Sequence, residues 1–147
     1  MTSKFNISTG AQLKSPALGR FYKRNGHKGK VQPNDICFWT ERDQAIVAAA
    51  RLQPVAGERN SLLLRGLWVD KALRRKGLGS ELLQRITHYL QEQSSNCYCL
   101  AYANLENFYK RQRFNQPSIE SCPSELLAQY HSYKKRGNNL TLLFYSA

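Results

Sequence analysis

Residues 61–93 decide the fold of this chain, and they read SLLLRGLWVDKALRRKGLGSELLQRITHYLQEQ. The run 61–69 is apolar throughout most of its length, which is typical of a strand near the middle of a sheet. From about Gly79 to Gln93, the apolar residues recur at helical spacing, at Leu82, Leu83, Ile86 and Leu90. A loop rich in basic residues and glycine separates the two runs. The stretch therefore predicts a strand, a positively charged turn and an amphipathic helix.

The sequence before this stretch predicts a helix and further strands. We expect a short strand at 4–8, a helix that starts at Ser15-Pro16 and ends at Asn25-Gly26, and strands at 35–41 and 44–52. Arg42-Asp43 is the expected turn between the last two strands. Three consecutive strands with short links predict an antiparallel meander over residues 35–69.

The sequence after this stretch alternates strands and helices. We expect a strand at 97–103, a helix at 105–113, a short strand near Phe114, a helix at 124–135 closed by Gly137, and a strand at 139–145. The passage from one strand through a helix to the next predicts a parallel crossover. The expected fold class is therefore mixed α/β, with a mostly antiparallel central sheet flanked by helices. We expect one domain over residues 1–147, with about the first 14 unassigned.

The composition excludes several classes of protein. The chain has 147 residues and a formal net charge of +12, with 22 Lys and Arg against 10 Asp and Glu. No apolar run is long enough to span a membrane, and no leader-like apolar segment follows the N-terminal residues. We therefore expect a globular cytoplasmic protein without a membrane partner. The basic surface favours an anionic partner, such as a phosphate-bearing small molecule or a nucleic acid.

The cysteines and histidines lack the spacing of a metal site. Cys97 and Cys99 are separated by one residue, which suits neither a redox pair nor a zinc site, and Cys37 and Cys122 lie far away. We expect reduced, buried thiols and no metal. No histidine is paired with them, so a nucleophilic cysteine is not favoured.

The loop between the predicted strand and helix has the chemistry of a phosphate site. The amides of a helix N-terminus have no intrahelical partners, and they attract anions. Gly77 and Gly79 let the backbone approach a phosphate, Ser80 adds a hydroxyl, and three basic residues precede them: Arg74, Arg75 and Lys76. The dinucleotide fingerprint needs a third glycine where Leu82 stands, and the NTPase loop needs its lysine after the glycines. The pattern indicates a diphosphate bound by backbone amides.

Here the sequence resembles the GNAT superfamily of acyl-CoA-dependent N-acyltransferases. The family motif Arg/Gln-x-x-Gly-x-Gly/Ala after an apolar strand corresponds to residues 74–79. A second similarity covers residues 103–114, where the family has an Asn after the next strand, then Phe-Tyr and then Gly-Phe. Arg113 stands in place of that glycine, which predicts a changed turn or a small strain.

The resemblance implies a role for each of these residues. Acetyl-CoA would be the acyl donor, with its pyrophosphate on the loop residues Arg74, Arg75, Lys76, Gly77, Leu78, Gly79 and Ser80. The pantetheine arm would pair with the strand end Leu67, Trp68 and Val69, and would meet Asn104 and Phe108. Tyr109 would lie near the thioester sulfur, as the general acid for the leaving thiolate.

The sequence identifies neither the general base nor the acceptor. Glu41, Asp70 and Glu106 are the candidate carboxylates for the base, and none is favoured over the others. His88 is expected to be a surface histidine. The expected reaction is direct attack of a primary amine on acetyl-CoA. Two alternatives remain: an enzyme that acetylates aminoacyl-tRNA or a basic nucleic-acid-binding module, and an inactive coenzyme-sensing regulator. A monomer and a homodimer are both compatible with the sequence.

Overall fold

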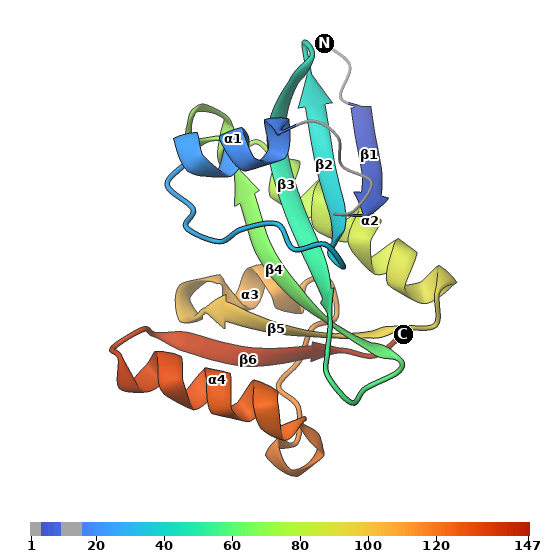
Figure 1. The fold of residues 1–147 in the computed structure, drawn as a ribbon, viewed down its shortest axis with the longest axis vertical. Helices are drawn as coiled ribbons and strands as arrows, with labels where there is room; N and C mark the ends of the chain where they lie inside the picture. Colours follow the sequence, from blue (N-terminus) through green and yellow to red (C-terminus); the bar gives the residue numbers. More distant parts are fainter. Residues whose placement is uncertain (1–3, 10–15) are drawn as a thin grey trace. The chain divides into compact units, whose positions relative to one another are not determined.

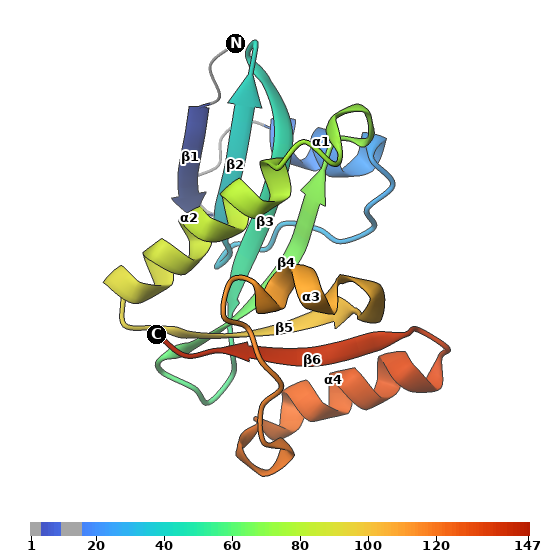
Figure 2. The same cartoon turned by 180° about the vertical axis from the view of Figure 1, so that it is seen from behind.

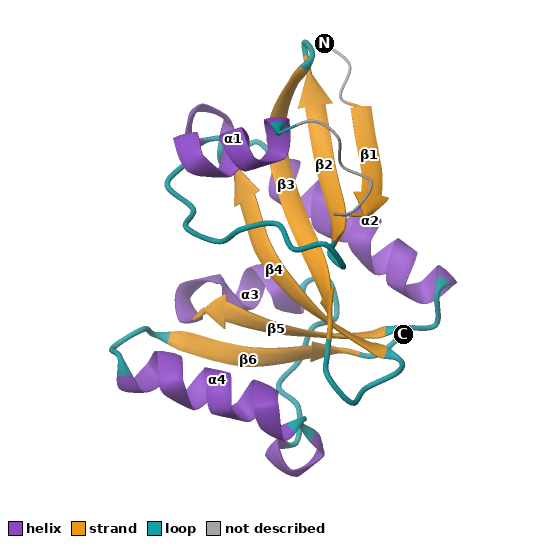
Figure 3. Cartoon of the chain, in the orientation of Figure 1, coloured by secondary structure: helices purple, strands orange, loops and turns teal. Residues whose placement is uncertain are grey.

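The computed structural model describes residues 4–9 and 16–147 and has the expected mixed α/β architecture (Figure 3). The strands are β1 Lys4–Thr9, β2 Ile36–Arg42, β3 Ala45–Pro54, β4 Ser61–Val69, β5 Asn96–Tyr102 and β6 Leu140–Tyr145. The α-helices are α1 Ala17–Arg24, α2 Leu78–Glu92, α3 Glu106–Lys110 and α4 Ser124–Lys135. A helix and further strands flank residues 61–93 on both sides, as the sequence predicts.

The six strands form one sheet in the order of the chain (Figure 1). β1 pairs antiparallel with β2, β2 with β3, and β5 with β6. β4 and β5 are parallel, and their register joins Ser61–Leu64 to Asn96–Cys99. The predicted parallel crossover is therefore confirmed, with α2 as its helix.

Internal contacts divide the chain into two compact units. The first unit comprises Met1–Gln53 and Arg65–Ile86, and the second comprises Pro54–Leu64 and Thr87–Ala147. The boundary crosses β4 and α2, so both units share these elements. The single domain expected from the sequence stays a prediction.

In the first unit, α1 and the start of α2 cover opposite faces of β2 and β3 (Figures 1 and 2). The α1 face is a buried apolar cluster that consists of Leu18, Phe21, Tyr22, Cys37, Ile46 and Ala49. Trp39 and Trp68 pack against its edge. Because side chains alternate along a strand, Phe38 lies on the other face, where it contacts the ring of Phe5.

In the second unit, α4 packs on one face of the β5–β6 pair. Its core cluster consists of Leu63, Tyr98, Cys122, Leu126 and Leu142. Cys97 and Cys99 alternate with Tyr98 and are buried on the other face. Tyr109 of α3 hydrogen-bonds with the Cys99 thiol on that face.

Two sequence predictions need correction in detail. The hairpin turn is Asp43-Gln44, because Arg42 still pairs with Ala45 in the ladder. Both turn residues have positive φ, 51° and 66°, as a two-residue turn between twisted strands requires. The short strand expected near Phe114 is a single bridge between Asn115 and Phe144.

The end of α4 is confirmed as predicted. Gly137 has a φ of 90°, its amide donates to the carbonyl of Lys134, and the amide of Asn138 donates to that of Tyr133. These two bonds form a Schellman cap.

Among the described residues, no helix is long and apolar enough to cross a bilayer.

Candidate functional site

The loop that follows β4 is tied to the sheet at its start. The amide of Asp70 donates to the carbonyl of Val47 over 2.8 Å. The Asp70 carboxylate accepts from the amide of Ala72 at 3.0 Å, which caps the short turn Lys71–Leu73. Arg74 Nε donates to the carbonyl of Val69 at 3.1 Å. The loop therefore has a fixed geometry before it reaches the glycines.

The second half of the loop turns into α2 through two left-handed residues. Arg75 has a φ of 64° and Gly77 a φ of 83°. A Cβ at Gly77 would meet no heavy atom within 4 Å, so glycine is there for its conformation and leaves the backbone open on that side. Leu78 is buried in the core, whereas Gly79 is half-buried at the helix start. Leu78 can therefore bind an anion only through its main-chain atoms.

The charges of the loop point to solvent. The exposed residues are Arg74, Arg75, Lys76, Gly77 and Ser80. The first amides of α2 add a partial positive charge at the same place. The loop can thus hold a multiply charged anion, and its charged residues surround an open helix N-terminus.

The side chains of the strand end Leu67–Val69 are half-buried, and that of Trp68 packs against other residues. Trp68 Nε1 donates to the carbonyl of Asn25 at 3.1 Å, and the Trp68 ring lies 4.8 Å from the ring of His27. Gly66, just before, has a φ of 63°, which marks an irregularity in β4. The side chain of Trp68 is thus fixed by α1 and the loop that follows it.

The second motif lies in the second unit. Asn104 is exposed in the turn Ala103–Leu105, and the amide of Ala103 donates to the carbonyl of Asn139 at 3.0 Å. Phe108 is half-buried and meets the ring of Tyr109 edge-on at 5.1 Å. The carbonyl of Tyr109 accepts from the amide of Phe114, which closes the turn after α3.

Tyr109 itself is only 6% exposed. Burial raises the pKa of its hydroxyl well above the usual value, and the neighbouring Cys99 adds to the shift. The group therefore stays protonated at physiological pH. It can donate a proton or a hydrogen bond but cannot act as a base.

The cysteines are inert thiols in this structure. All four are free and buried. Burial raises the pKa of Cys99 to about 12, although the hydrogen bond from Tyr109 opposes the shift. Burial also raises the pKa of Cys97 well above its usual value. Because the thiolate is the nucleophile, these residues do not suit covalent catalysis.

The three candidate carboxylates already have protein partners. Glu41 accepts from Trp39 Nε1 at 3.3 Å, Asp70 caps the loop, and Glu106 pairs with Lys110 at 2.8 Å. The hydrogen bond from Lys110 lowers the pKa of Glu106. His88 is exposed and pairs with Glu92 on the surface of α2. The structure favours none of the carboxylates as the base.

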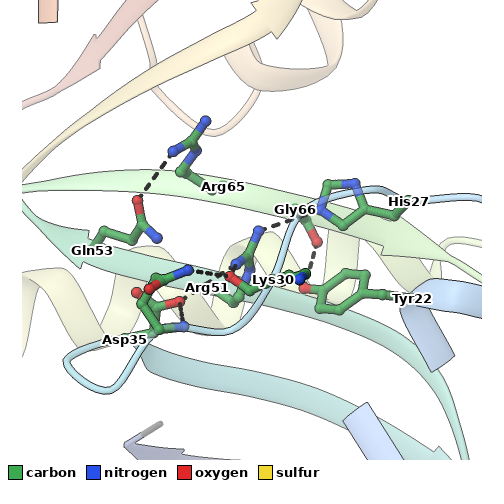
Figure 4. A network of polar contacts seen from close by, with 9 residues as sticks. Tyr22, His27, Lys30, Asp35, Arg51, Gln53, Arg65 and Gly66 are labelled. Carbon is green, nitrogen blue, oxygen red and sulfur yellow. Dashed lines mark hydrogen bonds and ion pairs between the residues drawn. The ribbon is translucent and has the colours of Figure 1, made fainter. Parts of the chain in front are cut away.

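A buried polar network on the α1 face was not predicted from the sequence (Figure 4). Arg51 of β3 is 2% exposed, lies 3.4 Å from Asp35, and donates to the carbonyl of Lys30. Its Nη2 lies 3.3 Å from His27 Nε2. The Tyr22 hydroxyl donates to the carbonyl of Gly66 at 2.8 Å. The network connects α1, the loop after it, β3 and β4.

Comparison with known proteins fixes the family. The model of the acetyltransferase (GNAT) family matches residues 9–114, which include the loop and the second motif. This chain belongs to the GNAT family. The resemblance stated from residues 74–79 and 103–114 is confirmed.

The relatives of this GNAT chain include curated and solved proteins. It is 30% identical over 111 residues to the probable N-acetyltransferase camello of Xenopus tropicalis, covering 72% of this chain and 50% of the relative. It is 27% identical over 108 residues to camello of Xenopus laevis. The chain thus spans about half the length of the curated relatives it matches.

Solved structures share the fold of this GNAT chain. An acyl-CoA N-acyltransferase from Pseudomonas aeruginosa aligns with a TM-score of 0.73 and 15% identity, covering 99% of this chain and 100% of that one. N-acetylglutamate synthase from Neisseria gonorrhoeae, complexed with coenzyme A and N-acetyl-glutamate, aligns with a TM-score of 0.67 and 18% identity. That alignment covers 99% of this chain and 35% of the synthase.

Two signals in this GNAT sequence could have revealed the buried network. Arg51 interrupts an otherwise apolar strand, and a charge at such a position is buried only with partners. Gly66 interrupts the apolar run of β4, which indicates an irregularity or a close approach of another group. The partners themselves, Tyr22, His27 and Asp35, have no pattern in the sequence.

Proposed function

We propose that this chain transfers the acetyl group of acetyl-CoA to a primary amine. The observation that carries the proposal is the β4–α2 loop, in which left-handed Arg75 and Gly77 lead into an open helix N-terminus surrounded by exposed cations. Coenzyme A is a polyanion, so these features fit its pyrophosphate. The coenzyme A named with the Neisseria synthase structure supports a CoA-derived donor.

The donor would be held through the main chain. The amides of residues 74–80 would bind the pyrophosphate, and the backbone of Leu67, Trp68 and Val69 would pair with the pantetheine arm. Gly77 fits this role because nothing occupies the space beside its Cα. Asn104 and Phe108 would add contacts to the arm, as the family resemblance implies. Among the described residues, no cluster of potential metal ligands accompanies the site.

The reaction requires two proton transfers. The neutral amine nitrogen attacks the thioester carbonyl carbon, the carbon–sulfur bond breaks, and the nitrogen loses a proton to a base. The departing thiolate of coenzyme A takes up a proton, which we assign to the Tyr109 hydroxyl. The raised pKa of Tyr109 keeps the hydroxyl protonated but makes it a weaker acid toward a thiolate, so the assignment rests on the position of Tyr109 in the motif and not on the shift. The amine must lose its proton through another group.

Titration of the purified protein with acetyl-CoA tests the donor site. The variant Gly79→Glu places a carboxylate at the start of α2, where the pyrophosphate would bind. Like-charge repulsion of several kcal/mol predicts a loss of affinity of roughly 100-fold or more. The control is Gly19→Glu, because Gly19 is an exposed helical glycine of α1 with nothing within 4 Å of its Cβ position.

The outcomes separate the competing functions. Equal affinity in folded Gly79→Glu protein and wild type would contradict the site. Coenzyme binding without turnover on any amine would indicate the sensing regulator. The charge of +12 also favours a nucleic-acid partner. Salt-sensitive RNA binding without coenzyme binding would indicate that function instead.

A further inference from the structure

Three hydrogen bonds connect α1 and its C-cap residue to the end of β4 and to the loop that follows it. The Tyr22 hydroxyl donates to the carbonyl of Gly66 at 2.8 Å (Figure 4). Asn25, the C-cap of α1, accepts twice: its carbonyl from Trp68 Nε1 at 3.1 Å, and its Oδ1 from the amide of Lys71 at 3.2 Å. α1 therefore holds this part of the chain at its start, in its middle and just beyond its end.

Arg51 determines the direction in which the Tyr22 hydroxyl donates. A guanidinium can only donate, so the phenol oxygen accepts in the hydrogen bond between Arg51 and Tyr22. The hydroxyl proton is then left for the carbonyl of Gly66. Burial raises the pKa of Tyr22 far above its usual value, so the hydroxyl stays protonated at physiological pH. Tyr22 is therefore a fixed donor to the main chain of β4.

The side chain of Asn25 is buried with both of its polar groups in use. Nδ2 donates to the carbonyl of Phe21 at 3.0 Å, one turn earlier in α1. This bond fixes the side-chain amide so that Oδ1 faces the amide of Lys71. Loss of either bond would leave a polar group of a buried residue without its partner, which is costly. Asn25 thus does more than cap its own helix.

Gly66 is the residue of β4 at which this support matters most. Its φ is 63°, and it comes two residues after Leu64, the last residue of β4 in the register with β5. Such an irregularity bends a strand and changes the direction of the groups that follow it. The Tyr22 hydroxyl lies 3.0 Å from the position of an ideal Cβ on Gly66. The direction of the peptide groups in Leu67–Val69 therefore depends on the bond from Tyr22.

The far end of the segment Leu67–Val69 is held by β3 and by Asn25. The amide of Asp70 donates to the carbonyl of Val47, and the next amide, that of Lys71, donates to Asn25. The main chain of the segment is thus fixed at both ends. A ligand that pairs with a main chain binds more tightly when that main chain is already in place. This segment is the one that the proposed function assigns to the pantetheine arm.

We propose that Tyr22 and Asn25 are positioning residues for acetyl-CoA, because they hold the main chain of Leu67–Val69 in the geometry that pairs with the pantetheine arm. This inference rests on the proposed function. Tyr22 is 2% exposed and Asn25 is 4% exposed, and both act through the main chain of β4. Arg51 contributes by directing the Tyr22 hydroxyl to Gly66.

Titration of Tyr22→Phe with two ligands tests the inference, because this variant loses the hydroxyl and keeps the ring in the core. We expect the Kd for acetyl-CoA to rise about tenfold, since one buried hydrogen bond no longer orders the segment. Adenosine 3′,5′-bisphosphate has phosphates but no pantetheine arm. Its Kd should change by less than about twofold. An unchanged Kd for acetyl-CoA in folded Tyr22→Phe would overturn the inference.

The matched control is Arg24→Met. Arg24 also belongs to α1, and its Nη2 donates to the carbonyl of Ile46 in β3 at 2.8 Å, the same length as the bond from Tyr22 to Gly66. This variant loosens α1 without removing a bond to β4 or to the loop. At about 0.15 M salt, which screens the lost charge, both Kd values should equal those of wild type. Equal weakening in the control and in Tyr22→Phe would assign the effect to general stability and overturn the inference.

Asn25→Leu tests the second positioning residue. The variant removes the acceptor of the Lys71 amide, whereas its main-chain carbonyl can still accept from Trp68. We expect the Kd for acetyl-CoA to rise by about the same factor as in Tyr22→Phe. A wild-type Kd in folded Asn25→Leu protein would overturn the assignment of Asn25.

Amide spectra of the free, 15N-labelled protein separate failure of this inference from failure of the proposed function. The amide shifts of Leu67–Val69 should change in Tyr22→Phe and stay at their wild-type values in Arg24→Met. Unchanged shifts in Tyr22→Phe would overturn the inference even if acetyl-CoA binds to wild type. Changed shifts with an unchanged Kd would reject the inference and retain the proposed function. Wild type that does not bind acetyl-CoA would reject the proposed function and the positioning role together.

Discussion

At the residue scale, Tyr109 is the residue whose role most needs a test. It is buried, its hydroxyl contacts Cys99, and its ring packs edge-on against Phe114 at 5.7 Å. Both a packing role and proton donation are compatible with these contacts. The two roles differ in what loss of the hydroxyl does to turnover.

We predict that Tyr109→Phe lowers kcat by roughly 100-fold or more, because the leaving thiolate loses its proton donor. The Kd for acetyl-CoA should stay near wild type. The matched control is Tyr145→Phe, since Tyr145 is also a buried phenol of the second unit, and its hydroxyl accepts from Arg113 Nη2 at 3.1 Å. Steady-state kinetics and titration measure both quantities. Wild-type kcat in a folded Tyr109→Phe protein would assign Tyr109 to packing alone.

Arg113 shows how far sequence reasoning reaches at this scale. The substitution of the family glycine predicted a changed turn or strain, and Arg113 keeps the left-handed geometry with a φ of 68°. Its guanidinium lies 5.6 Å from the centre of the Tyr145 ring and bonds to its hydroxyl. The strain was predictable from the residue type alone. The compensating contact was not, because Tyr145 is 32 residues away on β6.

At the element scale, β4 depends on a glycine in its middle. Gly66 has a positive φ, and an added Cβ would lie within about 3 Å of Tyr22 and Arg51. A left-handed conformation costs a side chain about 1–2 kcal/mol. Overpacking a tight site typically costs about 1–3 kcal/mol more. The two effects can be separated with a second glycine.

We predict that Gly66→Ala lowers the free energy of unfolding by about 2–5 kcal/mol. Gly57→Ala should lower it by only about 1–2 kcal/mol, because Gly57 has a φ of 78° but nothing within 4 Å of its Cβ position. Urea unfolding of both variants measures the difference. Equal losses would mean that the Arg51 guanidinium does not press against β4.

The helices and strands are the part of this structure that the sequence predicts best. The bounds of β4 and α4 agree with the predicted ranges 61–69 and 124–135, because apolar periodicity and the caps define them locally. The turn at Asp43-Gln44 was misplaced by one residue, because register depends on the partner strand. The position of the loop 74–80 between β4 and α2 was predictable for the same local reason, and its role in binding a phosphate stays a prediction. The Arg51 cluster was not, since it forms only when four segments meet.

At the scale of the whole molecule, buried ionisable groups define a pH range of stability. The pKa of His27 is lowered by burial and by neighbouring arginines, so the folded protein favours the neutral ring. Burial raises the pKa of Cys99 to about 12 and that of Cys97 above its usual value. The folded protein therefore favours the neutral forms at both ends of the range.

We predict that the free energy of unfolding is highest between about pH 6.5 and pH 9. Below this range, the unfolded chain protonates His27 before the folded chain does, so stability falls as the pH decreases. Above it, the thiols of the unfolded chain ionise while the buried thiols stay protonated, so stability falls as the pH increases. Each fully shifted thiol contributes a slope of about 1.4 kcal/mol per pH unit.

Urea unfolding at a series of pH values, with a reductant present, measures both limits. His27→Gln should flatten the decline between about pH 7 and pH 5, where a normal histidine titrates. Cys97→Ala combined with Cys99→Ala should flatten the alkaline decline and leave the acid side unchanged. An alkaline decline of undiminished slope in the double variant would assign it to Cys37, whose pKa burial raises to about 11, and to the buried tyrosines, whose pKa values are also raised. His27 belongs to the first unit and Cys97 and Cys99 to the second, so the two sets of variants test different parts of the fold.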